Sequence, residues 1–91
     1  MYYLLSYDFV ENMADRRVPY RAGHLALASA AHARGDLVLA GAFAEAPAGA
    51  VLVFRADQPS VVEQFVAADP YVANGLVTRW QVRALQVAFG G

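Results

Sequence analysis

The sequence contains no cysteine and no lysine, and it has few charged residues of either sign. The absence of cysteine excludes disulfide bonds, thiolate catalysis and thiolate metal ligands. Charged residues make up 16 % of the chain, and the formal net charge is -1. Such a charge balance produces no field that attracts nucleic acid, so we expect no nucleic-acid partner.

Long apolar runs are also absent. No stretch approaches the roughly 20 apolar residues that a membrane span needs, and the first nine residues lack the basic segment that opens a signal peptide. We therefore expect no membrane partner and a cytoplasmic location. His24 and His32 are too far apart along the chain to be a metal-ligand pair, and no phosphate-binding glycine motif occurs. We expect neither a metal nor another cofactor.

Apolar residues, in contrast, are abundant. They make up 58 % of the 91 residues, which exceeds the share in an average soluble domain. The length suits a single domain over residues 1–91. A domain of this size has little interior, so part of the apolar surface is expected to lie in a subunit interface.

The order of patterned segments predicts the fold. Helical periodicity and helix-capping residues occur twice, and four segments are rich in β-branched and aromatic residues. The expected strands are residues 2–9, 36–43, 50–56 and 76–89, and the expected helices are residues 18–34 and 57–68. This βαββαβ order is typical of the α+β ferredoxin-like fold, a four-stranded antiparallel sheet with two helices on one face.

The strands are apolar on both faces. On the first strand, the neighbours Leu4 and Leu5 point to opposite faces of the sheet, and on the third strand Val53 and Phe54 do the same. Two helices can cover only one face of the sheet, so the other face needs a partner. A second copy of the chain is the simplest partner, and we expect a homodimer whose sheets pack face to face.

Two polar residues form the central candidate site. His24 lies beside the apolar stripe of the first helix, and Asp69 follows the second helix in an Asp-Pro sequence. The fold allows the two helix ends to approach each other. A carboxylate on one imidazole nitrogen fixes the tautomer and makes the other nitrogen a better base, so the pair is a candidate catalytic general base. The alternative is structural: a core histidine, and an aspartate that caps backbone N–H groups.

Three further residues are candidates for substrate binding. Arg21 lies one turn before His24 and is suited to an anionic substrate, or else is a solvated arginine at a helix start. Ser6, with its neighbour Tyr7, offers a hydroxyl from the first strand. Tyr71 can wall a pocket with its ring or simply pack. His32 is expected to be structural, at a helix end where a cation suits the helix dipole.

The motifs "RAGHLALASAAHARGDLVLAGAF" and "VAADPYVANGLVTRWQVRAL" span much of both halves of the chain. In these motifs the sequence resembles the YciI-like (YCII-related domain) family. The resemblance implies dimers of the dimeric α/β-barrel type, with His24 and Asp69 as the active-site pair. Some members of that family are dehydrochlorinases of chlorinated hydroxyhydroquinones, and more distant relatives in the superfamily isomerise muconolactone.

Three functions fit these observations. The first is a cofactor-free lyase or isomerase that acts on a small acidic or phenolic organic molecule, with His24 as the base and Asp69 orienting it. The second is a non-catalytic small-molecule binding module. The third is an interaction domain whose function is the dimer itself. Turnover that depends on His24 distinguishes the first from the other two.

Overall fold

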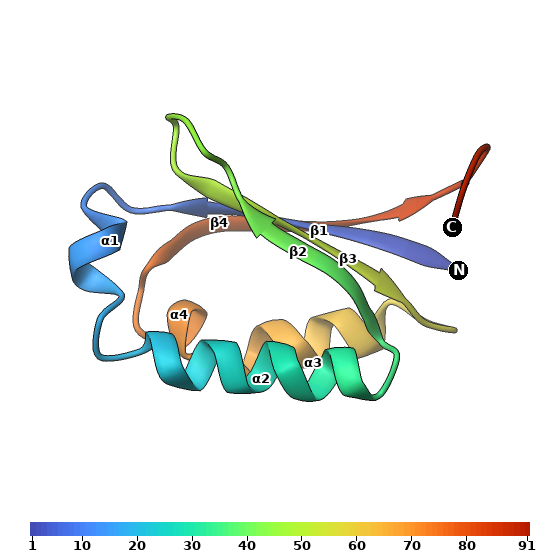
Figure 1. Cartoon of the computed structure of the whole chain (residues 1–91), viewed down its shortest axis with the longest axis horizontal. Helices are drawn as coiled ribbons and strands as arrows, with labels where there is room; N and C mark the ends of the chain where they lie inside the picture. Colours follow the sequence, from blue (N-terminus) through green and yellow to red (C-terminus); the bar gives the residue numbers. More distant parts are fainter.

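Strand β1 (Tyr2–Phe9) lies inside a four-stranded sheet in the computed structural model, which describes residues 1–91 (Figure 1). It pairs antiparallel with β3 (Gly49–Arg55) on one side and with β4 (Val77–Leu85) on the other. Strand β2 (Leu37–Ala42) pairs with the outer edge of β3. The resulting order, β2-β3-β1-β4, confirms the predicted ferredoxin-like fold.

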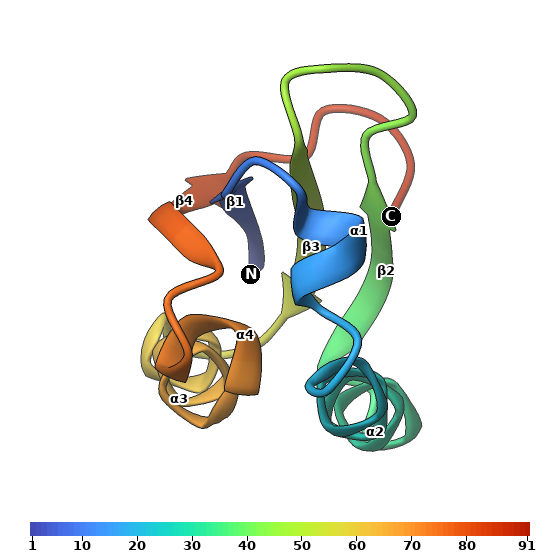
Figure 2. The same ribbon diagram turned by 90° about the vertical axis from the view of Figure 1, so that its left-hand side faces the viewer.

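Both long helices cover the same face of the sheet. Helices α2 (Arg21–Ala33) and α3 (Ser60–Ala68) lie side by side beneath it in two perpendicular views (Figures 1 and 2). Two short helices were not predicted: α1 (Met13–Arg16) lies before α2, and α4 (Pro70–Ala73) follows α3. None of the helices has the length and apolar character required to cross a membrane.

The helix starts differ from the prediction. Helix α2 begins at Arg21, because the residues before it form a turn in which the N–H of Tyr20 donates to the carbonyl of Arg17. The predicted helix over residues 18–34 would have placed Pro19 in its first turn, whereas Pro19 precedes α2 in the structure. Pro59 is the N-cap of α3 and likewise lies outside the helix.

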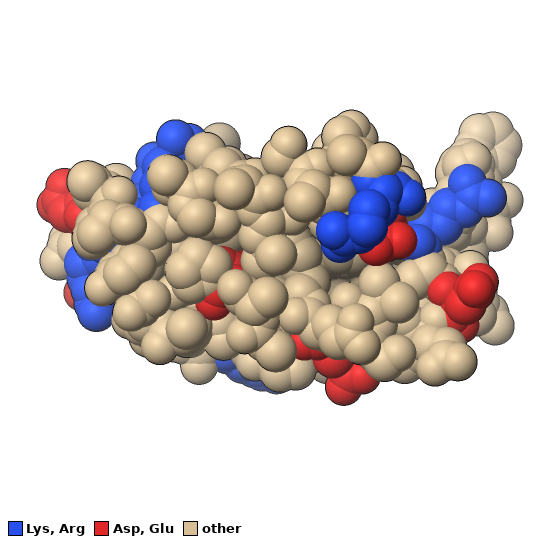
Figure 3. All heavy atoms as spheres, turned by 90° about the horizontal axis from the view of Figure 1, so that it is seen from below, with Lys and Arg blue, Asp and Glu red and all other residues tan.

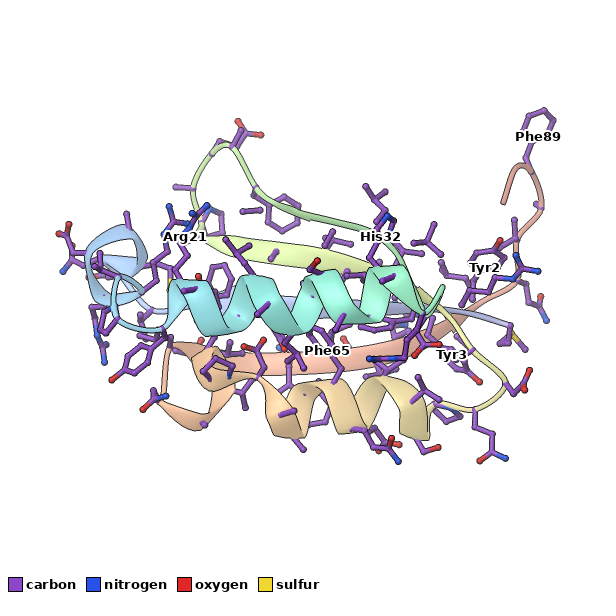
Figure 4. All side chains as sticks on the ribbon, turned by 60° about the horizontal axis from the view of Figure 1, so that its bottom comes forward. Tyr2, Tyr3, Arg21, His32, Phe65 and Phe89 are labelled. Atoms are coloured by element: carbon purple, nitrogen blue, oxygen red, sulfur yellow. The ribbon has the colours of Figure 1, made fainter.

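Strand β4 is shorter than predicted. It ends at Leu85, which pairs with Tyr2 at the start of β1. Beyond this point β1 offers no further backbone partner, so the alternating apolar residues up to Phe89 do not extend the strand. Phe89 is fully exposed, and in Figure 4 it projects away from the body of the molecule.

The core lies between the sheet and the helices. Alternate residues of β1 (Tyr3, Leu5 and Tyr7) are buried on this face, as strand geometry requires. They pack against residues of the neighbouring strands and of both long helices: Leu37, Leu52, Phe54, Ala31, Val62, Phe65 and Val66. The alternation therefore directs every second residue of β1 towards the helices.

The opposite, open face of the sheet carries no helix. Leu4 and Ser6 of β1 lie on it, beside Val53 and Val51 of β3, and all four are only partly buried. At the β2 side, Phe43 is 57 % exposed. The prediction that both faces carry apolar residues is confirmed. Figure 1 shows the β2–β3 connection and the C-terminal segment rising on the open side, near opposite ends of the sheet.

Candidate active site

Asp69 lies at the junction of α3 and α4. Its extended backbone conformation ends α3, and Pro70 occupies the first position of α4, where a missing N–H costs nothing. The carboxylate accepts a hydrogen bond from the backbone N–H of Tyr71 at 3.0 Å. Asp69 is also the only charged residue that is buried, with 0 % exposure. The capping function that the sequence suggested for Asp69 is therefore present.

The same carboxylate contacts His24, which lies in the first turns of α2. The Nδ1 atom of His24 is 2.9 Å from Oδ1 and 3.0 Å from Oδ2 of Asp69. Close packing of α2 on α4 permits this contact, since a Cβ atom at Gly23 would lie 3.4 Å from Cγ of Pro70. The structure thus brings together two residues that are 45 positions apart.

This contact determines the tautomer of His24. A carboxylate bonded to Tyr71 N–H acts as an acceptor, so Nδ1 of His24 must carry the proton and donate it. The other ring nitrogen, Nε2, then keeps its lone pair in the neutral imidazole. The side chain of His24 is 15 % exposed, and it lines a cavity. The contact at Nδ1 therefore leaves Nε2 as the ring nitrogen without a hydrogen-bond partner in the chain.

Tyr7 supplies a third hydrogen bond to Asp69. Its hydroxyl donates to Oδ2 at 2.8 Å from the buried face of β1. Burial raises the pKa of Tyr7 above its ordinary value, and the negative charge of Asp69 and the hydrogen bond raise it further. Tyr7 therefore remains a neutral donor. Three donors on one buried carboxylate compensate for its loss of solvation.

The ring of Tyr71 lies flat against the imidazole of His24. The ring centroids are 4.0 Å apart and the planes are inclined by 8°. Burial raises the pKa of the Tyr71 hydroxyl, whereas the positive charges of Arg17 and Arg21 partly lower it and Asp69 adds to the rise. Stacking and the hydrogen bond to Asp69 together restrict the orientation of the imidazole ring.

A cavity of about 200 Å³ opens beside this cluster, between α2 and the strands β2 and β3. Its wall on the sheet side contains Leu52 and several small residues, among them Ala40, Ala42 and Ala50, and its other walls include Phe9 and Met13. It is smaller than the pockets of roughly 300–1,000 Å³ that hold drug-sized ligands. The space suits a small organic molecule of about one ring.

The sequence-predicted site residues divide into two groups. Arg21, His24 and Tyr71 line the cavity, with Asp69 directly behind His24. Ser6 does not join them, because it lies on the open face, opposite Val51 of β3. The prediction that Ser6 adds its hydroxyl to the same pocket as His24 is therefore wrong: successive strand residues point to opposite faces, and Tyr7 is the hydroxyl on the site face.

Arg17 is a cavity-lining residue that sequence analysis did not select. It caps the C-terminal end of α1, a helix that was not predicted, and it is partly buried. The signal available in the sequence was its spacing of four residues before Arg21. That spacing places two side chains together only when the chain between them turns, as it does here. No group of three or more potential metal ligands occurs in the structure.

The fold and the site define a class of protein: a ferredoxin-like α+β domain with a histidine–aspartate pair at a small, largely apolar cavity. Residues 1–86 match the model of the YCII-related domain family, and the chain belongs to this family. The resemblance noted in the sequence is thereby confirmed. None of the curated proteins matches the sequence.

A solved structure shares the fold. It is 5-chloro-2-hydroxyhydroquinone dehydrochlorinase from Burkholderia phenoliruptrix AC1100, in complex with 2,5-dihydroxybenzoquinone. The two chains superpose with a TM-score of 0.81 and 22 % sequence identity, over 94 % of each chain. At this level of identity the similarity establishes a common fold.

Proposed function

We propose that this protein is a cofactor-free lyase or isomerase that acts on a small acidic or phenolic organic molecule. The observation that carries the proposal is the contact between His24 and the buried Asp69 at the wall of a cavity. A polarised histidine with a free Nε2 at a small cavity is suited to proton abstraction. The dehydrochlorinase with the same fold acts on a substrate of this chemical type, which supports the proposal.

In the proposed reaction, Nε2 of His24 removes a proton from an activated C–H or O–H group. The electron pair left behind forms a new C=C or C=O bond. In an elimination, the leaving group departs with its bonding electrons. In an isomerisation, the proton returns from His24 to a different atom of the same molecule. The negative charge of Asp69 stabilises the imidazolium that forms in between, and Tyr71 keeps the ring in place.

The test compares the two histidines of α2. Wild type, His24→Gln and His32→Gln are incubated with 5-chloro-2-hydroxyhydroquinone and with a panel of phenols, lactones and hydroxyquinones, and chloride release or product formation is measured. We expect turnover in wild type and in His32→Gln, and a loss of about 10²–10⁴-fold in His24→Gln, the range for a general base. Turnover that survives in a folded His24→Gln protein would contradict the proposal.

We further propose that the open face of the sheet binds a second copy of the chain. Apolar side chains on and beside this face, including Leu39 at 64 % exposure and Phe43, would remain in water in a monomer. Val53→Asp places a charge in the middle of the face, and we expect a dimer in wild type and a monomer in this variant by analytical ultracentrifugation. Gln64→Asp, on the exposed surface of α3, is the matched control and should leave the dimer intact. A monomeric wild type would refute the proposal that the open face binds a second copy of the chain.

A further inference from the structure

Two arginine side chains line the cavity without a partner. Arg17 and Arg21 take part in no side-chain hydrogen bond, and the ion pairs of the chain are His24 with Asp69 and Arg34 with Asp36. Figure 4 shows Arg21 at the beginning of α2, and the cavity that it lines is bounded on the other side by residues of β2 and β3. Arg17 is partly buried, whereas Arg21 is exposed at the start of α2. A partly buried positive charge such as that of Arg17 is normally paired with an anion.

The surroundings contain no anion that serves this purpose. The remaining cavity wall is apolar apart from His24 and Tyr71, and no carboxylate lies within ion-pair distance of either arginine. Asp69, behind His24, is already bonded to three donors. Both guanidinium groups are close enough to Tyr71 to lower the pKa of its hydroxyl. Two like charges that converge on one small space repel each other unless a negative group lies between them.

The face of the molecule that carries the helices has no large basic patch. Figure 3 shows that charged groups are few and separated on the face of the molecule that carries the helices. A general attraction for polyanions is therefore not the explanation for the arginine pair. The cavity itself, with room for about one ring and an apolar alanine wall, limits the size of the anion.

We propose that Arg17 and Arg21 form an anion subsite within the His24 cavity, so that the ligand is a small organic anion with an apolar body: a carboxylate, or an enol or phenol that is ionised near neutral pH. The charged oxygen atoms bind the two guanidinium groups, and the apolar part contacts the alanine wall. This inference rests on the proposed function for its mechanistic consequence. When His24 takes the proton, the electron pair moves onto an oxygen beside the arginines, which stabilise the added negative charge.

The experiment uses a matched pair of probes, benzoate and benzamide, which have the same shape and differ in charge. Dissociation constants are measured by NMR titration with wild type, Arg17→Gln and Arg21→Gln. The control is Arg16→Gln, which removes the same charge next to Arg17 but outside the cavity lining. We expect wild type and Arg16→Gln to prefer benzoate by about tenfold or more, and each cavity variant to lose about tenfold in benzoate affinity only, the effect of one charge-assisted hydrogen bond.

The outcomes separate this inference from the proposed function. Equal affinity for both probes in wild type, no detectable benzoate binding, or unchanged selectivity in both cavity variants would overturn the anion subsite even if His24-dependent turnover is found. Conversely, His24→Gln should retain the preference for benzoate, because the arginines remain. Arginine-dependent selectivity without turnover of any compound in the panel would uphold the subsite and contradict the enzyme. Neither arginine has a partner in the chain, so we expect both variants to fold.

Discussion

Helix α2 holds a histidine near each end, and the two lie in different surroundings (Figure 4 labels Arg21 near one end and His32 near the other). Nδ1 of His24 donates to the carboxylate of Asp69 at 2.9 Å, and Nδ1 of His32 lies 2.8 Å from the carbonyl oxygen of Leu37. Both contacts fix an orientation. Only the first places a full negative charge behind the ring, and only the first ring lines the cavity with the two arginines.

The comparison shows that the acceptor distinguishes a candidate base from a structural histidine. A neutral carbonyl holds the ring, as expected for a connection between a helix and the following strand. A buried carboxylate also stabilises the imidazolium that forms when the ring accepts a proton. The structure supports the prediction that His32 is structural, since it links the C-terminal turn of α2 to the first residue of β2.

Removing the charge behind His24 tests this difference most strongly. Asp69→Asn leaves a neutral acceptor oxygen for Nδ1 of His24. The hydrogen bond of His24 then resembles that of His32, whose acceptor is a neutral carbonyl. On the proposed function, we expect kcat/KM to fall by about 10²–10⁴-fold. The measurement is steady-state kinetics with any substrate found in the panel. A variant that keeps full activity while remaining folded would show that the charge of Asp69 has no part in the reaction.

Removing one of the donors to Asp69 has a smaller effect, on stability. Tyr7→Phe keeps the buried ring but deletes the hydrogen bond from the hydroxyl to the carboxylate. We expect the free energy of unfolding to fall by about 1.5–3 kcal/mol, the range for a hydrogen bond to a charged group. Urea unfolding checks this value. Tyr3→Phe, on the same buried face, is the control, because its hydroxyl makes no hydrogen bond within the chain, and it should cost less.

The stability of the protein should also decrease at alkaline pH, because Tyr7 donates to the carboxylate behind His24. The pKa of Tyr7 is raised in the folded protein above its value of 10.0 in the unfolded chain. Its contribution to stability is therefore fully present below pH 10 and is lost as the pH rises beyond it, because the unfolded chain releases the proton first. We expect the free energy of unfolding to fall above pH 10 by up to about 1.4 kcal/mol per pH unit for this tyrosine. Urea unfolding between pH 9 and pH 11 should give a shallower decline for Tyr7→Phe, and equal slopes would refute the assignment.

The smallest effect is expected at the other end of the helix. His32→Ala removes a single hydrogen bond to a backbone carbonyl that is only partly buried. We expect a loss of about 0.5–1.5 kcal/mol in the free energy of unfolding and no change in kcat/KM. Thermal unfolding together with the activity assay measures both quantities. A loss of activity in this variant without a loss of stability would mean that the two ends of α2 are not as different as the contacts indicate.

Much of the fold could be predicted from local patterns. The aromatic-rich composition of β1 and the helical periodicity after Arg21 identified their elements, and the order of elements left the ferredoxin-like arrangement as the fitting topology. Errors arose at boundaries. Helix α2 starts later than predicted because a turn ends at Tyr20, and β4 stops at Leu85 because β1 has no residue left to pair with.

The site could be predicted only in part, and β1 shows why. Ser6 and Tyr7 are neighbours with hydroxyl groups, and both faces of the strand are apolar. Strand geometry therefore predicts that Ser6 and Tyr7 point to opposite faces of the sheet, but it does not predict which of them faces the helices. The packing of α2 and α3 decided this, and it directed Tyr7 to Asp69 and left Ser6 on the open face.

The sequence by itself determined the elements, their order and the residue types available for chemistry, because propensity and periodicity act between near neighbours. Tertiary structure alone decided that His24 meets Asp69, that Tyr7 joins them from 62 positions away, and that Arg17 reaches the same cavity as Arg21. These contacts depend on how closely α2 packs on α4 and on how the chain turns before α2. Both follow from the burial of the whole core, to which residues from every part of the chain contribute.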